Sequence, residues 1–365
     1  MSITIVSSLD VFCRQQACKA LAADLPNAVV VLHDLLEDGL VIRRIFSDGQ
    51  VAERHESTLE HGCLSCTVRL DVVPTVDRLL ARGEQNIIVG LPPAVLSETA
   101  VLALHKGLTR QFTIDSVVLA CAPDVAEDQI WDHHTLFESG YTPTPQDDRT
   151  AGEFLIGELS FNDTVLLSDP DLIPVDPDIR SRGAQLIHEL APHAKIGETG
   201  SSFRLGHHNY AQASARTAPG SVQVAKASSM PPFSTVVQRA ERPLHPERFR
   251  RALGTLAQGC CWLRGQVWIA AAPERCIAIR GIGPRVWLEN TGPWITDSPT
   301  VSDSAEVRHK WDPVFGDRGT ILAATGEGMD ATEIQRLLAS CELTDAEMMA
   351  GKASFQDPFN LSSSH

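Results

Sequence analysis

The sequence predicts a two-domain α/β protein, in which a parallel, helix-covered sheet is followed by a smaller α+β domain. The chain has 365 residues, more than a single core usually holds. In its first half short apolar runs alternate with helical patterns, which is typical of parallel strands joined by helices. Residues 214–232 are rich in Ser, Ala and Pro and lack periodicity. We therefore expect a first domain at 1–213, a linker at 214–232 and a second domain at 233–360.

The elements of the first domain follow from these runs. A strand at Ile3–Val6 leads into a helix near Asp10–Ala23, for which Asp10 is a suitable N-cap. Further strands are expected at Ala28–Leu32, Asn86–Leu91, Ser116–Cys121 and Thr164–Leu167. Further helices are expected near Val68–Ala81, Ser97–His105 and Ile179–Leu190.

The second domain mixes strands and helices without regular alternation. A strand is expected at Ser234–Gln238, and apolar runs lie at Gln266–Ala271 and Thr320–Ala324. The expected helices begin near His245 and lie near Ala331–Ser340 and Thr344–Met349. His245 is expected to serve the structure, because a lone histidine beside prolines is more often a satisfied structural residue than a ligand.

Composition and charge exclude several classes of protein. The 31 Lys and Arg residues against 46 Asp and Glu give a net charge of −15, which disfavours direct contact with nucleic acid. No apolar run approaches the roughly 18 residues of a membrane span, and the start has no basic region ahead of its short apolar stretch. The nine cysteines are scattered, which favours reduced thiols over a disulfide framework. We expect a cytoplasmic protein that does not enter a membrane.

The sharpest local motif is a pair of cysteines, Cys63 and Cys66, at the expected start of a helix. Backbone N–H groups at a helix N-terminus lower thiol pKa values, and the resulting thiolates suit zinc or reversible oxidation. Two sulfurs are half of a tetrahedral zinc shell, and His61 is the nearest additional donor. Other candidates for the shell are His55, Cys13, Cys121 or a partner protein. Taken alone, the pair is equally well interpreted as two inert structural cysteines.

A phosphate-binding loop is missing where an α/β fold of this type would carry one. The pattern GxxxxGK[ST], whose backbone cradles phosphates and whose hydroxyl holds Mg²⁺, occurs nowhere in the chain. The segment after the first strand, Val6–Arg14, has no glycine, and Asp10 adds negative charge there. Arg14 or Lys19 could supply a cation, but neither restores the geometry of the loop.

Several short motifs in one order give the chain a resemblance to the CobW-type family of P-loop metal-homeostasis proteins. The motifs are Gly62–Arg69, Arg242–Arg248, Leu263–Trp268, Gly292–Trp294 and Trp311–Arg318, followed by Leu343–Glu347 and Asp357–Phe359. In Gly62–Arg69 a serine, Ser65, stands where the family has a third cysteine. The resemblance implies a degenerate P-loop GTPase-like domain followed by a CobW C-terminal domain, and it implies zinc as the metal.

The resemblance also identifies two eroded nucleotide motifs. The segment Val89–Pro93 lacks the acidic residue that the family has there, and Ser168–Asp171 retains only Asp171 of the base-reading motif. Arg14 and Asp171 are therefore the candidate remnants of a nucleotide site. With the phosphate, metal and base motifs all altered, GTP and Mg²⁺ binding is doubtful and efficient GTP hydrolysis is disfavoured.

Three functions compete at this point. One actinobacterial subgroup of the family combines the same eroded motifs with the two-cysteine segment. The resemblance of this chain to that subgroup implies that it recruits a ribosome hibernation factor to the small ribosomal subunit when zinc is scarce. The alternative is a GTP-dependent zinc metallochaperone. A thiol oxidoreductase that uses Cys63 and Cys66 is a weaker alternative, because the surrounding sequence is not thioredoxin-like.

Overall fold

The computed structural model describes residues 1–169, 174–201, 203–222, 231–294 and 315–361. These residues form two compact units, Met1–Thr217 and Ala218–His365. The division falls inside the segment expected to be a linker. Helix α8 (Tyr210–Thr217), however, continues ordered structure through residues 214–217, four positions beyond the expected end of the first domain. Asp171 and residues 311–314 lie outside the described residues. Every helix of the described chain is too short or too polar to cross a lipid bilayer.

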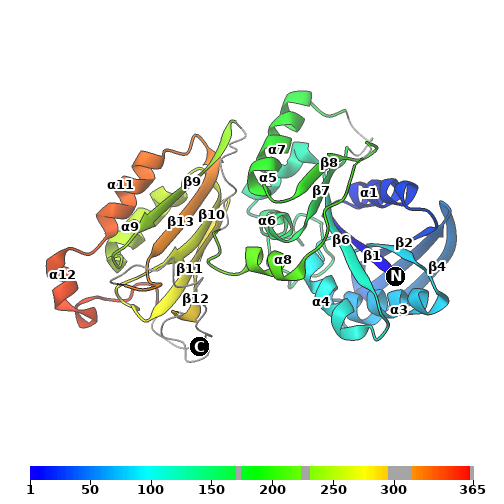
Figure 1. Cartoon of the computed structure of the whole chain (residues 1–365), viewed down its shortest axis with the longest axis horizontal. Helices are drawn as coiled ribbons and strands as arrows, with labels where there is room; N and C mark the ends of the chain where they lie inside the picture. Colours follow the sequence, from blue (N-terminus) through cyan, green and yellow to red (C-terminus); the bar gives the residue numbers. More distant parts are fainter. Residues whose placement is uncertain (170–173, 202, 223–230, 295–314, 362–365) are drawn as a thin grey trace. The chain divides into compact units, whose positions relative to one another are not determined.

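The first unit is built on an eight-stranded sheet in the order β4-β3-β2-β5-β1-β6-β7-β8 (Figure 1). Six strands are mutually parallel: β1 (Ser2–Ser7), β2 (Ala28–Leu35), β5 (Asn86–Gly90), β6 (Thr113–Cys121), β7 (Thr164–Leu167) and β8 (Lys195–Glu198). Strand β1 is central, with Ile5 facing Val89 on β5 and Val117 on β6. The expected parallel sheet is confirmed.

Helices cover both faces of this sheet, because successive residues of a buried parallel strand point to opposite sides. Ile5 belongs to the apolar cluster that includes residues of α3 and α4, whereas its neighbour Val6 packs with residues of α1. The helices are α1 (Val11–Asp24), α3 (Val73–Arg82), α4 (Ser97–Gly107), α5 (Ala126–Trp131), α6 (Ala151–Phe161), α7 (Pro177–Leu190) and α8. Short 3-10 turns occur at Glu37–Gly39 and Pro123–Val125.

One edge of the sheet was not expected from the sequence. Strands β3 (Leu40–Ser47) and β4 (Gln50–Thr58) form an antiparallel hairpin beside β2. Most side chains of β4 are exposed, so the strand has no apolar alternation that would reveal it. Ion pairs stabilise the hairpin instead. Arg43 on β3 and Arg78 on α3 both contact Glu53 on β4.

The second unit is a smaller α+β fold, as expected. Its antiparallel sheet runs in the order β12-β11-β10-β13-β9. The strands are β9 (Phe233–Ala240), β10 (Cys260–Val267), β11 (Arg275–Ile282), β12 (Arg285–Pro293) and β13 (Thr320–Glu327). The helices are α9 (Pro246–Ala257), α11 (Ala331–Cys341) and α12 (Asp345–Ala350), with a 3-10 turn at Lys352–Ser354.

Two sequence expectations for this unit have different outcomes. His245 is confirmed as a structural residue, because its ring nitrogen caps α9 by accepting from the N–H groups of Glu247 and Arg248. The apolar run at Gln266–Ala271 contains only the end of a strand, since β10 ends at Val267. Residues 268–271 remain buried as a loop, which explains their apolar character.

Candidate functional site

Cys63 and Cys66 lie at the start of the short helix α2 (Leu64–Thr67), which continues through a π-helical turn (Val68–Val72) into α3. Cys63 is the N-cap, and its sulfur accepts a hydrogen bond from the backbone N–H of Cys66 over 3.2 Å. The hydroxyl of Ser65 lies 3.4 Å from the same sulfur. Both thiols are free and half-buried. The expected position of the pair at a helix N-terminus is confirmed.

The two thiols differ in acidity. Burial raises the pKa of Cys63, but hydrogen bonds from the Cys66 thiol, the Ser65 hydroxyl and the backbone more than offset it, so the pKa lies below its ordinary value. The hydrogen bond to Cys63, together with burial, raises the pKa of Cys66, and the charge of Arg69 only partly opposes this. Cys63 is therefore the more acidic thiol of the pair, and Cys66 donates a hydrogen bond to it.

Within the part of the chain that the structure describes, no third His, Cys, Asp or Glu side chain converges on these thiols. Among the described residues, the one group of three or more His, Cys, Asp or Glu side chains with converging donor atoms is Asp132, His133 and His134. His61 is exposed and is not part of a converging group with the two sulfurs. The other candidates are also elsewhere: His55 is exposed on β4, whereas Cys13 and Cys121 are buried, with burial raising the pKa of both thiols.

Two soft sulfur donors, one of them with a lowered pKa, nevertheless fit zinc chemistry. In such a pair Cys63 and Cys66 would hold the ion and leave further positions for water or for a partner's side chain. Such an incomplete shell suits transfer or sensing better than permanent structural binding.

A charged cluster that the sequence analysis missed fixes the helix behind the thiols. Asp71 accepts hydrogen bonds from Arg43 on β3 over 3.0 Å and from Ser57 on β4 over 3.2 Å. Its carboxylate also lies 3.0 Å from Nε2 of His33, whose side chain is fully buried on β2. Burial lowers the pKa of His33 despite the neighbouring carboxylate. Asp71 thus ties the segment that follows the cysteines to three strands of the sheet.

A cleft of about 380 Å³ borders the two-cysteine segment. Its walls come from α2, the turn after β5, the first turn of α4 and the loop before α6: Leu64, Ser65, Ala94, Val95, Leu96, Thr99, Thr144, Gln146, Asp147 and Arg149. The hydroxyl of Thr144 donates to the carbonyl of Gly62 over 3.4 Å. Arg149 donates to the carbonyl of Ala94 over 3.0 Å. These hydrogen bonds fix the loop before α6 against the two-cysteine segment and against the turn after β5.

After β1, where a P-loop fold carries its phosphate-binding loop, the carboxylate of Asp10 caps the following helix. Asp10 caps α1 and accepts from the N–H groups of Phe12 and Cys13, each over 2.7 Å. These are helix N-terminal donors of the kind that a bound phosphate would use. The N-cap role predicted for Asp10 is confirmed, and it gives a physical reason for the missing loop.

Arg14 does not face this position, which corrects its assignment as a nucleotide remnant. Its guanidinium is buried and donates to the carbonyls of His33 over 2.7 Å and Leu91 over 2.6 Å. It also pairs with Asp34 over 2.5 Å. The sequence could not show this, because the partners lie on β2 and after β5. The side chain holds strands together and is not placed to meet a ligand.

A further cavity lies at the carboxyl ends of β1 and β6, and acidic side chains form part of its lining. It measures about 170 Å³ and includes Asp10 and Asp124 among its lining residues. None of the described residues that line it is Lys or Arg. In open α/β sheets ligands bind at this edge, and a triphosphate requires cations there. The cavity therefore lacks the charge that a nucleotide site needs.

The chain is similar to known proteins in its second unit and along most of its length. Residues 233–342 match the family described as the cobalamin synthesis protein cobW C-terminal domain. The chain is 27% identical to a zinc chaperone of Mycobacterium tuberculosis over 91% of this chain and 87% of that protein. It is 24% identical to zinc-regulated GTPase metalloprotein activator 1 of Dictyostelium discoideum, over 83% and 70%. The zinc-bound YjiA GTPase from E. coli matches 94% of this chain and 99% of that chain, with 11% identity and a TM-score of 0.36.

Proposed function

Because this chain belongs to the CobW-type family, we propose that it is a zinc-linked recruitment protein that brings a ribosome hibernation factor to the small ribosomal subunit during zinc starvation. One observation carries the proposal. The thiol pair is retained at a helix start, whereas Asp10 satisfies the amides that a phosphate would use. The metal-handling half of the family's chemistry is thus preserved without its nucleotide half.

The residues of the chain give this function a physical basis. Cys63 and Cys66 hold the ion when zinc is present, and zinc supplies a bond between the loop and the helix start that the metal-free protein lacks. Cys63 and the cleft-lining residues Leu64 and Ser65 are consecutive. Binding or losing the ion therefore changes one wall of the cleft, while Asp71 holds the following helix in place. A partner that prefers one of these two states becomes coupled to zinc.

Capture experiments in cells test the recruitment step. A tagged chain is isolated from zinc-starved and zinc-replete cells, and the bound proteins are identified by mass spectrometry. We expect small-subunit ribosomal proteins and a hibernation factor in the starved sample and their depletion in the replete sample. The Cys63→Ser variant should lose this dependence on zinc, whereas Cys276→Ser, which alters another half-buried thiol in the second unit, should retain it. Recovery of a metalloenzyme in place of ribosomal proteins would contradict the proposal.

The second candidate is a zinc metallochaperone driven by GTP. It is favoured by two relatives, one named a zinc chaperone and the other a zinc-regulated GTPase metalloprotein activator. It requires nucleotide turnover, which the capped α1 and the acidic cavity disfavour. A purified chain that passes zinc to an apo client protein only when GTP and Mg²⁺ are added would favour this candidate over recruitment.

A further inference from the structure

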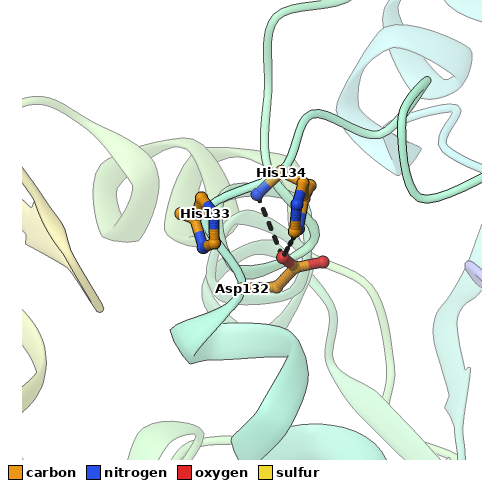
Figure 2. A group of neighbouring side chains, drawn as sticks. All are labelled: Asp132, His133 and His134. Carbon is orange, nitrogen blue, oxygen red and sulfur yellow. Dashed lines mark hydrogen bonds and ion pairs between the residues drawn. The ribbon is translucent and has the colours of Figure 1, made fainter.

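A second group of metal-binding side chains lies away from the thiol pair, at the end of α5. Asp132 ends this helix, and His133 and His134 follow it directly (Figure 2). One donor atom from each of the three side chains lies within 4.8 Å of the other two. The histidine rings are 4.1 Å apart between centroids, and both are exposed. An ion from solvent can therefore reach all three donors.

The carboxylate of the group is oriented by neighbouring hydrogen bonds. Oδ1 of Asp132 accepts from the backbone N–H of His134 over 3.0 Å and lies 2.7 Å from Nδ1 of the same residue. Oδ2 accepts from the hydroxyl of Ser139 over 2.9 Å. Hydrogen bonds of this kind around a ligand fix its direction and are typical of metal sites.

Backbone hydrogen bonds and a second acidic side chain lie next to this group. The loop closes on itself, since the N–H of Leu136 donates to the carbonyl of Arg149 over 2.7 Å. Glu138 accepts from the N–H of Thr135 over 2.8 Å. Hydrogen bonds from Thr135, and after them the charges of the two histidines, lower the pKa of the Glu138 carboxyl group. Two carboxylates therefore surround two imidazoles, which gives the place a negative charge when the imidazoles are neutral.

We propose that Asp132, His133 and His134 form a solvent-accessible site for a divalent transition metal ion of the zinc type, separate from the site at Cys63. With bonds of about 2.0–2.1 Å, tetrahedral zinc donors lie about 3.3 Å apart. The three donor atoms lie within 4.8 Å of one another, and those of Asp132 and His134 are 2.7 Å apart, so rotation of the exposed rings is enough to bring the donors to the ion. An ion bound between Asp132 and Nδ1 of His134 takes the place of the proton in this contact, and the neutral imidazole then carries its proton on Nε2.

The alternative is an ordinary turn, in which Asp132 merely accepts a hydrogen bond from the backbone of His134. That interpretation explains the contact of Asp132 with His134, but it assigns no role to His133, whose donor atom also converges on the group. A nitrogen and oxygen donor set suits zinc, cobalt, nickel or copper, and not calcium or magnesium. With three protein ligands, the site keeps at least one position for water or for a donor from another molecule.

The test uses the full chain carrying Cys63→Ser and Cys66→Ser, so that the Cys63 and Cys66 pair does not contribute. Zinc bound per chain is measured by equilibrium dialysis with mass spectrometry, and Co²⁺ alone is used as the spectroscopic probe. We expect one equivalent of zinc and a visible cobalt spectrum without a thiolate charge-transfer band. Adding His133→Ala and His134→Ala should abolish both signals, and Asp132→Asn should weaken binding by at least about tenfold.

The matched control replaces two exposed histidines elsewhere, His105→Ala and His207→Ala, in the same background. It should retain the full equivalent of zinc, and circular dichroism should show that all variants are folded. Either of two results would overturn the proposal: no metal bound by the double cysteine variant, or equal binding after loss of His133 and His134. Because the thiols are absent throughout, neither result depends on whether the Cys63 and Cys66 site binds zinc.

Discussion

The backbone N–H of Cys66 donates to the sulfur of Cys63 over 3.2 Å, so that the first thiol of the pair is stabilised as a thiolate by the second residue's own amide. The pair is asymmetric, because hydrogen bonds from the Cys66 thiol, the Ser65 hydroxyl and this amide lower the pKa of Cys63, whereas the hydrogen bond to Cys63 raises the pKa of Cys66.

Replacing Cys63 or Cys66 by serine should lower the zinc content of the chain by one equivalent and leave the unfolding midpoint nearly unchanged, because both side chains lie at a surface helix start. Zinc affinity at this site should also fall on acidification, since protons compete with the ion for the thiolates. Native mass spectrometry gives the stoichiometry. Cys260→Ala and Cys261→Ala remove buried thiols of the second unit and should keep the zinc. Unchanged zinc content in the Cys63→Ser and Cys66→Ser proteins would reduce the pair to structural cysteines.

The purified chain should hydrolyse GTP with Mg²⁺ no faster than a protein-free control. The physical reason is that Asp10 occupies the helix amides and that Arg14 is buried among backbone carbonyls. Phosphate release is the measurement. Magnesium-dependent turnover that disappears in an Asp10→Ala protein would show that a working site exists at this edge of the sheet.

Asp10→Ala should destabilise the first unit by about 1 kcal/mol, the usual cost of losing an N-cap side chain. The amides of Phe12 and Cys13 then lose their acceptor. Urea unfolding measures the change. Asp10→Asn, which still accepts a hydrogen bond, should recover most of the loss. Equal destabilisation by both substitutions would mean that the negative charge matters and the cap does not.

Acidification should destabilise the first unit through His33. Burial holds the pKa of this histidine below 6.5 in the folded state, whereas the unfolded chain takes up the proton near 6.5. Protons therefore favour unfolding, and the free energy of unfolding falls as the pH drops below 6.5, until the lowered folded pKa is reached. The contribution of His33 to the slope in that window is at most about 1.4 kcal/mol per pH unit.

Comparison of slopes isolates this effect from the other histidines. The His33→Gln protein should show a shallower dependence between pH 6.5 and the folded pKa than the unaltered chain, whatever its absolute stability. His105→Gln changes an exposed histidine and should leave the slope as it is. If His33→Gln also leaves the slope unchanged, burial of His33 does not govern the acid response.

Limited proteolysis should cut first between Ala218 and Pro232 and leave two stable fragments. The composition of this segment is typical of linkers, and the compact units meet at Thr217 and Ala218. Intact-mass analysis of the fragments locates the cut. Initial cleavage between Arg242 and Arg280, within the strands and helix of the second unit, would show that the boundary is misplaced.

The sequence predicted what depends on local pattern and missed what depends on distant partners. The start of α1 at Asp10 and the position of Cys63 before a helix follow from capping and spacing, and both are confirmed. The direction of Arg14 depends on carbonyls of His33 and Leu91 that are brought close only by the sheet. No spacing rule in the sequence reveals such a partner.

The candidate metal donors show the same difference between what the sequence pattern predicts and what the fold determines. His61 is close to the thiols in sequence but does not converge with them, because proximity along the chain does not fix the direction of an exposed side chain. Asp132, His133 and His134 are consecutive, and consecutive residues of a regular helix do not face one another. Their donors converge because α5 ends at Trp131, which a pattern search for spaced ligands does not detect.

The cap at Asp10 has a consequence for how this protein responds to its surroundings. A protein whose helix start is completed by a dissociable phosphate gains stability with the logarithm of the ligand concentration. Here the completing anion is covalently part of the chain and is present at a fixed stoichiometry of one. The start of α1 therefore needs no dissociable anion to satisfy the amides of Phe12 and Cys13.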